Sequence, residues 1–343
     1  MSRAQRPAAS PDAGAERAPR RVVLDVDTGT DDAVAIMLAL RHPAIELVGI
    51  TTVNGNAPID VVVDNTLRVV DLAGARVSVH RGAAKPLERD DFPVARALRP
   101  DRAVHAAPLP LPPARSRPSD VPAVDFLVDT AMSSPGAISL VTTAPLTNLA
   151  LALAREPRLA NAFAEVLTLG GIHAIGNVTP AADFNVWADP EAARAVLRAG
   201  LRRHLLVPLD TSQRAPVTGH HCETLAASGD PLARAAARLI AARIEAYADR
   251  DDLAAQAAAP VHDAFAVAAL VDRALLRTQA LHVDVETHGE LTTGRTVIDV
   301  DGRGGRAPNV TVGWPGDVTT FADELVRRLT APPTGSHETR RPL

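Results

Sequence analysis

The stretch RVVLDVDTGTDDAVAIMLALRHP, residues 21–43, decides the fold. Residues 22–24 form a short apolar run with two β-branched side chains, which predicts a buried strand. Residues 33–40 are rich in helix formers, and Pro43 ends that helical run. Residues 28–30, Thr-Gly-Thr, supply turn chemistry between the two. A strand, a turn and a helix in this order predict a corner of an α/β sheet, where ligands bind beyond the strand ends.

Four aspartates lie within eight positions of this corner: Asp25, Asp27, Asp31 and Asp32. Acids this close repel one another, and a bound divalent cation is the simplest compensation; oxygen ligands suit Ca²⁺ or Mg²⁺. The alternative interpretation makes Asp31 and Asp32 first-turn residues favoured by the helix dipole, and the other two solvated loop acids. The run is not an EF-hand, because Thr30 and Ile36 stand where that loop needs Gly and Glu.

Composition limits the classes of protein and function. The 343 residues suffice for one large α/β domain or two smaller ones, and the net charge of −4 with 3% aromatics argues against a nucleic-acid partner. Cys222 is the only cysteine, so no internal disulfide forms. No apolar run approaches the roughly 20 residues of a membrane span, and residues 1–20 lack the apolar core of a secretory signal. We therefore expect a cytoplasmic enzyme.

Strand-like and helix-like segments alternate along the chain. Strands are expected at 45–53, 77–79, 138–141, 166–169 and 201–207, and helices at 59–73, 124–133, 190–199 and 318–329, with one starting near Pro145. Residues 219–270 are mostly helical in pattern, with a break near 249–260. Long loops are expected at 81–121 and 172–188, and an antiparallel pair at 281–286 and 295–300. The pattern predicts one α/β domain over 21–330, a mostly parallel open sheet flanked by helices with a Rossmann-like core, between disordered tails at 1–20 and 331–343.

Polar groups gather where the predicted strands end. Asn54 and Asn56, Thr143, and the loop from Asn177 to Asn185 each follow a strand, and His262-Asp263 opens a helix. Taken singly, each is an ordinary turn or capping residue. Because the carboxyl ends of parallel strands share one edge, the set predicts one pocket.

Five short motifs carry a resemblance to a known family. They are DVDTGTDDAVA, VNGN, APLTN, GN with DFN downstream, and HD at the start of a helix. In order and approximate spacing, over about residues 21–330, the chain resembles the inosine-uridine preferring nucleoside hydrolase family. The resemblance implies a nucleoside hydrolase-like fold, one Ca²⁺ per subunit, a ribonucleoside substrate in purine or pyrimidine salvage, and a homodimer or homotetramer.

The resemblance also implies roles for particular residues. The Ca²⁺ ligands would be Asp27, Asp32, the backbone carbonyl of Thr143, and Asp263, with Asp27 also the general base. Ribose contacts would be Asp31, Asn56 and Asn185, with Asn177 and Asp183 near the 5′-hydroxyl and His262 near the leaving base. This set suits the chemistry, because N-glycosidic cleavage passes through an oxocarbenium-like sugar that carboxylates and amide oxygens stabilise.

The chain departs from the family pattern at several places. Asp183 stands where the family usually has Glu, Ala144 replaces a Gly, and the Gly-rich segment expected near His105 is not recognisable. His80 and His105 are candidate pocket groups, although ordinary structural roles are favoured for both. Tyr247 lies where relatives often place an aromatic ring against the nucleobase.

Two other hypotheses remain open from the sequence. Asp25-Val26-Asp27-Thr28 superficially fits the motif of a haloacid dehalogenase-type phosphatase with Asp25 as nucleophile, but the only lysine, Lys85, comes too early. The other hypothesis is a non-catalytic relative that binds metal and a ribosyl group, or a hydrolase of a non-standard ribosyl substrate.

Overall fold

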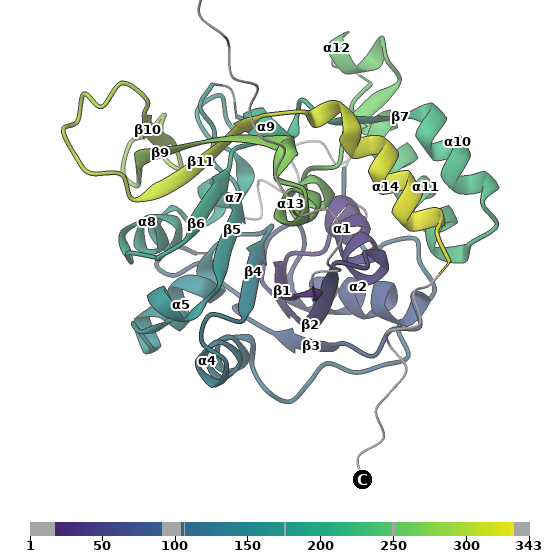
Figure 1. Cartoon of the computed structure of the whole chain (residues 1–343), viewed down its shortest axis with the longest axis horizontal. Coiled ribbons are helices and arrows are strands. Elements are labelled where there is room, and N and C mark those ends of the chain that lie inside the picture. The colour runs from purple at the N-terminus through teal and green to yellow at the C-terminus, as the bar shows by residue number, and fades with distance from the viewer. Residues whose placement is uncertain (1–17, 91–103, 106, 175, 249–250, 333–343) are drawn as a thin grey trace, which may run out of the picture.

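The computed structural model describes residues 18–90, 104–105, 107–174, 176–248 and 251–332 (Figure 1). Its centre is a nine-stranded sheet in the order β10-β9-β11-β6-β5-β4-β1-β2-β3. The strands are β1 (Arg20–Val26), β2 (Ile45–Thr52), β3 (Ser78–Arg81), β4 (Ile138–Thr142), β5 (Glu165–Leu169), β6 (His204–Val207), β9 (Leu276–Val285), β10 (Thr296–Asp299) and β11 (Val310–Pro315). A separate antiparallel pair joins β7 (Pro216–Thr218) to β8 (Ala258–Pro260).

The expected mostly parallel sheet is confirmed. Six neighbouring strands of the sheet, β6-β5-β4-β1-β2-β3, run parallel to one another. Strand β11 pairs with β6 in parallel and with β9 antiparallel. The antiparallel pair expected near the C-terminus is β9 with β10, and β11 makes it a three-stranded extension. In the central strand β1, Asp25 lies opposite Thr51 of β2 and Thr142 of β4, which sets the carboxyl ends of three strands side by side.

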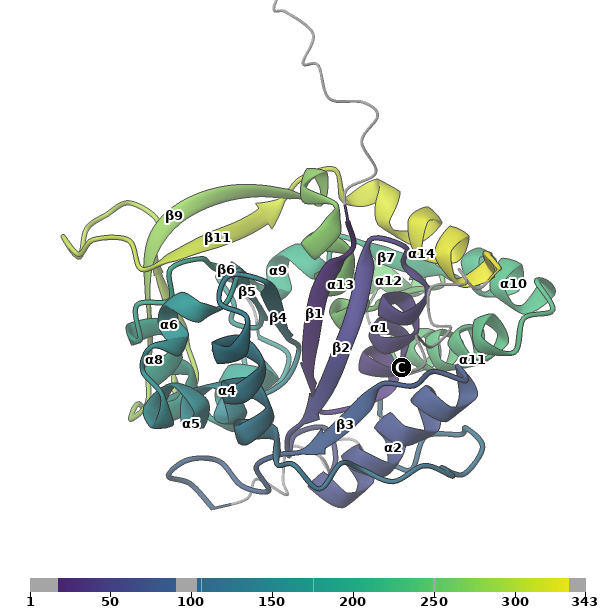
Figure 2. The ribbon, with the colours of Figure 1, turned by 60° about the horizontal axis from the view of Figure 1, so that its bottom comes forward.

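Helices cover both faces of the sheet (Figure 2). The helices on one face are α1 (Thr30–Arg41), α2 (Ile59–Leu72), α10 (Gly219–Ala227), α11 (Pro231–Ala246), α13 (His262–Val271) and α14 (Phe321–Thr330). Those on the other are α4 (Ala123–Ser133), α5 (Thr147–Arg155), α6 (Leu159–Ala162) and α8 (Pro190–Arg198). Helix α1 is buried from Thr30 to Leu40, since α2, α11, α13 and α14 surround it. A helix enclosed in this way needs the nearly all-apolar sequence that it has beyond its first turn.

Several of the shortest helices and strands were not predicted from the sequence. The predicted loop 172–188 contains the unpredicted α7 (Phe184–Ala188), and the break predicted near 249–260 in the helical region contains α12 (Asp251–Ala254) and β8. Also missed were α9 (Leu209–Ser212), the 3₁₀ turn η2 (Arg273–Leu275), α6, β7 and β11, while the 3₁₀ turn η3 (Val318–Thr320) begins the helix predicted at 318–329. Most of these span three to five residues, too few for a hydrophobic period to show.

Several predicted boundaries shift slightly or lie outside the described residues. Helix α5 begins at Thr147, two residues after Pro145, and β1 begins at Arg20, inside the predicted N-terminal tail. The rest of both predicted tails, except residues 18–19 and 331–332, lies outside the described residues, as do 91–103 and 106 of the predicted loop 81–121. The described parts of that loop hold one bridge, between His80 and Ser119. No helix in the described ranges has the length and apolar character to cross a membrane.

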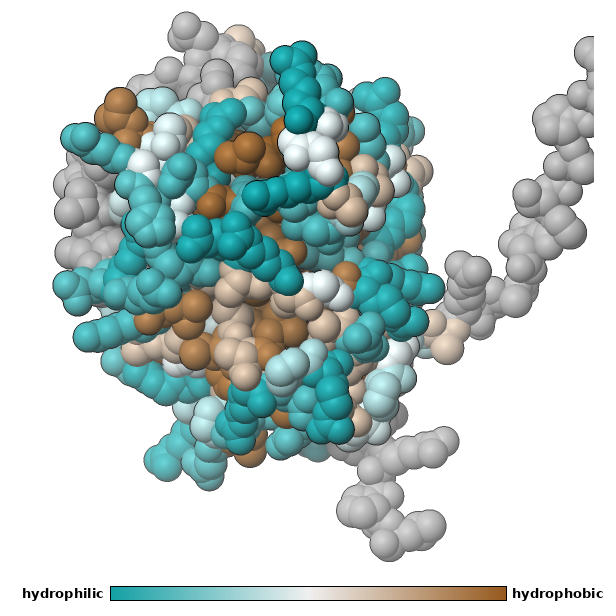
Figure 3. All heavy atoms as spheres, turned by 90° about the vertical axis from the view of Figure 1, so that its left-hand side faces the viewer, coloured by the Kyte–Doolittle hydropathy of each residue, from teal (hydrophilic) through white to brown (hydrophobic). Residues whose placement is uncertain are grey.

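The antiparallel extension forms one end of the molecule. Figure 3 shows this end, where apolar side chains gather among hydrophilic ones. In and beside β10 the exposed large apolar residues are Leu291, Val297 and Val300, of which Leu291 is 83% exposed. Strand β10 is also an edge of the sheet, so its outer backbone groups are open to a partner.

Candidate active site

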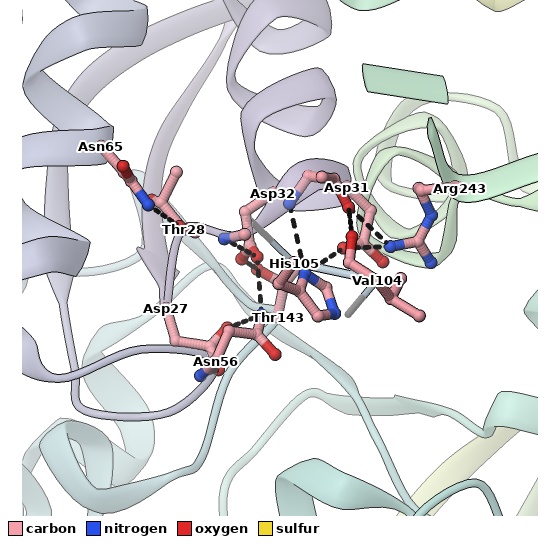
Figure 4. A network of polar contacts seen from close by, with 12 residues as sticks. Asp27, Thr28, Asp31, Asp32, Asn56, Asn65, Val104, His105, Thr143 and Arg243 are labelled. Atoms are coloured by element: carbon pink, nitrogen blue, oxygen red, sulfur yellow. Dashed lines mark hydrogen bonds and ion pairs between the residues drawn. The ribbon is translucent and has the colours of Figure 1, made fainter. Parts of the chain in front are cut away.

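Several of the predicted polar residues meet at the carboxyl edge of the sheet. Figure 4 shows five of them close together: Asp27, Asp31, Asp32, Asn56 and Thr143. Ligand oxygens of Asp31, Asp32 and Asp263 all lie within 4.8 Å of one another. Asp31 and Asp32 occupy the first turn of α1 and Asp263 the first turn of α13. Two helix N-termini, each with a positive dipole end, therefore support the same group of acids.

Asp27 is held by the loop that follows β2. The Asn56 backbone N–H donates to Asp27 Oδ2 at 2.7 Å, and its side-chain Nδ2 donates to Asp27 Oδ1 at 3.1 Å and Asp32 Oδ2 at 3.2 Å. Gly55 makes this approach possible, since a Cβ there would lie 1.9 Å from Asp27 Oδ2. Asn56 thus joins the two acids that the sequence assigned to a metal.

Asp32 is fixed from two further directions. The Gly29 backbone N–H donates to Asp32 Oδ2 at 2.9 Å, and the Thr143 hydroxyl donates to Asp32 Oδ1 at 3.0 Å. The backbone carbonyl of Thr143, the atom implied as a ligand, accepts the Asn185 Nδ2–H at 2.9 Å. Hydrogen bonds therefore join the loops after β1, β2, β4 and β5 around Asp32.

The acids repel one another in a place with little water. Burial, followed by the charge of Asp32, raises the pKa of Asp27 well above its ordinary value. Burial and then Asp31 raise the pKa of Asp32 to about 6, and burial with Asp31 and Asp32 raises that of Asp263. Buried carboxylates at this density, with a backbone carbonyl beside them, match the oxygen ligands that hard divalent cations take. The residues present fit a metal ion.

Arg243, from the last turn of α11, reaches Asp31. Its NH1 lies 2.9 Å from Asp31 Oδ1 and donates to the Thr30 hydroxyl at 2.9 Å. Burial favours a higher pKa for Asp31, but the Arg243 charge, with smaller effects of His105 and His262, lowers it below the usual range. Asp31 thus differs from the other acids of the cluster, because it already has a cation.

His105 also lies in the site. Burial lowers its pKa to about 4, so the imidazole is neutral near pH 7, and its Nδ1 accepts the Thr30 backbone N–H at 3.2 Å. The proton of the neutral ring is therefore on Nε2. Although Nδ1 is 3.7 Å from Asp31 Oδ1, the neutral ring gives that acid no ion pair.

His262 begins α13 and is 5% exposed. Its Nδ1 shares a hydrogen bond of 2.8 Å with the Ser212 hydroxyl, at the end of α9. A hydrogen bond at Nδ1 fixes the orientation of the ring and with it the direction of Nε2. The structure thus holds His262 in one orientation beside the acid that follows it.

The residues expected near the 5′-hydroxyl form hydrogen bonds with backbone N–H groups. Asp183 is the N-cap of α7 and accepts the Gly171 N–H at 2.6 Å and the Asn185 N–H at 3.0 Å. Asn177 is exposed, and its Oδ1 accepts the Phe184 N–H at 2.9 Å. Asn185 Nδ2 donates to the Leu169 carbonyl at 3.1 Å as well as to Thr143. These contacts fix the loop that borders the acid cluster.

Comparison with known proteins gives the family. The model of the inosine-uridine preferring nucleoside hydrolase family matches residues 22–323. The chain belongs to this family. The pyrimidine-specific ribonucleoside hydrolase RihA of Citrobacter koseri is 35% identical over 309 residues, which are 90% of this chain and 97% of that protein.

Solved structures of nucleoside hydrolases share the fold. The plant nucleoside hydrolase PpNRh1 is 29% identical with a TM-score of 0.81, over 92% of this chain and all of that one (100%). The purine-preferring ribonucleoside hydrolase from Gardnerella vaginalis is 28% identical with a TM-score of 0.82, over 91% of this chain and 98% of that one. The family, the fold class and the enzyme class expected from the sequence are thereby confirmed.

Of the residues in this nucleoside hydrolase's site, Arg243 was not predicted from the sequence, and His105 was named but not favoured. Arg243 lies within an Ala-rich helix, and its one signal is its spacing: it follows the buried Leu239 and Ile240 by four and three positions, on the buried face of α11. His105 was not favoured as a pocket group and proves to contact the first turn of α1. His80, by contrast, is structural as expected, since it stacks on Phe126 and both ring nitrogens have partners.

Truncating Asp183 to alanine is expected to destabilise the hydrolase by about 1–3 kcal/mol, because the buried Gly171 and Asn185 N–H groups lose their acceptor. Urea unfolding measures the change. Asp230→Ala is the matched control: Asp230 caps α11 in a partly exposed position (21%) and also pairs with Arg41, and its replacement is expected to cost about 1 kcal/mol. Equal losses for the two variants would show that burial of the α7 cap adds nothing.

Proposed function

We propose that this protein hydrolyses the N-glycosidic bond of ribonucleosides and releases ribose and a free base, with Ca²⁺ as its metal. The observation that carries the proposal is the buried cluster of Asp31, Asp32 and Asp263, with Asp27 joined to Asp32 through Asn56, in a chain of the nucleoside hydrolase family. Ca²⁺ would be held by Asp27, Asp32, Asp263 and the backbone carbonyl of Thr143, and it would lower the pKa of a water molecule and coordinate the two vicinal hydroxyls of ribose.

The chain's own residues would do the rest. Asp27, raised in pKa and oriented by Asn56, accepts the proton of the attacking water. Asp31, Asn56 and Asn185 surround the sugar, and their oxygens stabilise the positive charge that develops on it. Asn177 and Asp183 would border the 5′-hydroxyl, where Asp183 also keeps α7 in place.

Departure of the base needs a proton or a hydrogen bond. The hydrogen bond of His262 to Ser212 and its position next to Asp263 support this role. A base leaving with negative charge is stabilised by donation from the ring Nε2.

A panel of ribonucleosides tests the proposal. Uridine and cytidine come first, since RihA is named as pyrimidine-specific, followed by inosine, adenosine and guanosine. The readout is released ribose, with and without a chelator followed by Ca²⁺. Release from any of them that depends on the metal supports the reaction, and silence across the panel from Ca²⁺-loaded protein would favour the non-catalytic binding role or a non-standard ribosyl substrate.

The phosphatase alternative meets a structural obstacle. Asp25 is fully buried, and its Oδ1 accepts the Thr51 hydroxyl at 2.6 Å and Asn148 Nδ2 at 2.8 Å. A nucleophilic aspartate must reach a phosphate ester. Asp25 instead supports the loop from inside the sheet.

The assembly is a further part of the proposal. The exposed apolar side chains on and beside β10 support association of this chain into a homodimer or homotetramer. Light scattering after gel filtration measures the mass of the particle. The cytoplasmic location and the role in salvage remain predictions from the sequence.

A further inference from the structure

The guanidinium of Arg243 is buried between the first turn of α1 and the segment that leads into α13. The side chain is 1% exposed, and Figure 4 shows it beside Asp31. NH1 contacts Thr30 and Asp31 in the first turn of α1, while Nε donates at 3.0 Å to the carbonyl of Pro260, shortly before His262 and Asp263. The arginine therefore ties the start of α1 to the segment that delivers Asp263.

Arg243 is also the main countercharge of the acid cluster. Within the described part of the chain, it is the arginine or lysine that makes an ion pair with one of the four clustered aspartates. Its charge is permanent, since burial opposes it but Asp31 and other nearby groups raise the pKa of the guanidinium above its ordinary value. Part of the repulsion among the acids is thus offset without any metal.

Two different sets of three acids could supply the carboxylate ligands of the metal. The oxygens that lie closest together belong to Asp31, Asp32 and Asp263, whereas the family resemblance selects Asp27, Asp32 and Asp263. The ion pair separates the two sets, because Asp31 Oδ1 faces a guanidinium at 2.9 Å and a metal ion on the same oxygen would be repelled.

We propose that Arg243 is a positioning residue that holds Asp31 out of metal coordination and offsets the cluster's negative charge, so that the site forms before the metal binds. The inference rests on the proposed function only in taking the acid cluster as a metal site. Its chemical consequence is that Asp31 stays available for a sugar hydroxyl, while Asp27 takes the third carboxylate position on the metal.

Isothermal titration calorimetry tests this role of Arg243. It measures binding of Ca²⁺, added as CaCl₂ without nucleoside, to the full-length, chelator-stripped protein. Arg243→Met removes a positive charge beside the site and is expected to tighten Ca²⁺ binding about tenfold or more. Arg243→Lys keeps a positive charge beside Asp31 although it loses the Nε contact with Pro260, and it is expected to bind more weakly than Arg243→Met and within about threefold of wild type. Arg238→Met, at an exposed position of the same helix, is the matched control and is expected to bind as wild type does.

The double variant Arg243→Met/Asp31→Asn decides which acids are ligands. It replaces a buried ion pair by a neutral pair and so has the better chance to fold. If Asp31 is not a ligand, the double variant binds Ca²⁺ within about threefold of wild type, since the net charge of the site is unchanged. Binding weakened a hundredfold would make Asp31 a ligand and overturn the proposal.

Weaker binding by Arg243→Met would also overturn it, since a purely structural role predicts a loosened site. Should that variant fail to fold, the double variant still gives the answer. The calorimetry needs no turnover, so wild type that binds Ca²⁺ but releases no ribose would contradict the proposed function and leave this inference intact. Wild type that binds no Ca²⁺ would contradict both.

Discussion

Replacing Asp27 by asparagine is expected to lower kcat for base release roughly 1,000-fold. Asparagine has nearly the shape of aspartate and can keep one of the two contacts with Asn56 through its single oxygen, but it cannot take the proton of the attacking water. It also removes one of the negative charges expected to hold the metal. Steady-state rates of ribose release at saturating Ca²⁺ measure the change.

The control for this variant is Asp64→Asn, on the exposed side of α2, where the acid pairs with Arg68. A surface change of this kind is expected to leave kcat within about twofold. Circular dichroism establishes that both variants are folded. A folded, Ca²⁺-loaded Asp27→Asn enzyme that keeps more than a tenth of wild-type kcat would remove Asp27 from the role of general base.

Removing the metal is expected to have the second largest effect. Dialysis against a chelator should reduce ribose release by about a hundredfold or more, since water at neutral pH is too weak a nucleophile without a cation. Added Ca²⁺ should restore the rate, and Mg²⁺ in parallel ranks the two ions. The chelator saturated beforehand with Ca²⁺ is the control, and inhibition by that mixture would mean the chelator acts some other way.

Stability should follow the metal as well. The buried acids repel one another, and a cation that binds only the folded protein stabilises it by about 2.7 kcal/mol at a hundredfold excess over its Kd. For a chain of this size the melting temperature should rise by roughly 5 °C. Differential scanning calorimetry of stripped and reloaded protein measures it, and an unchanged Tm would mean that the cluster does not bind the ion.

Much of the architecture could be read from the sequence because the central strands are continuous apolar runs and α1 is apolar over most of its length. Strand ends on one edge of a parallel sheet also bring their polar residues together, which is why Asp27, Asn56 and Thr143 meet as expected. Asp263 joins them from the first turn of α13, which follows β8 of the separate antiparallel pair. These predictions depend on local pattern and on the geometry of parallel strands alone.

The rest depends on contacts that no local pattern encodes. Arg243 reaches Asp31 only because α11 packs against α1, and a single arginine in an alanine-rich helix gives little sign of it. Asp183 looked like a residue that contacts substrate, yet its carboxylate caps α7, a helix of five residues that no hydrophobic period reveals.

The site is also assembled late along the polypeptide. Its first acids come from β1 and α1, but β4 is added only after β2 and β3, and Arg243 and Asp263 belong to α11 and α13. A nascent chain leaving the ribosome therefore carries Asp27, Asp31 and Asp32 for most of its synthesis with neither the arginine nor the last acid in place. Ca²⁺ binding would then report that synthesis and folding have passed α13, and stalled chains that end before α13 should remain unable to capture the ion.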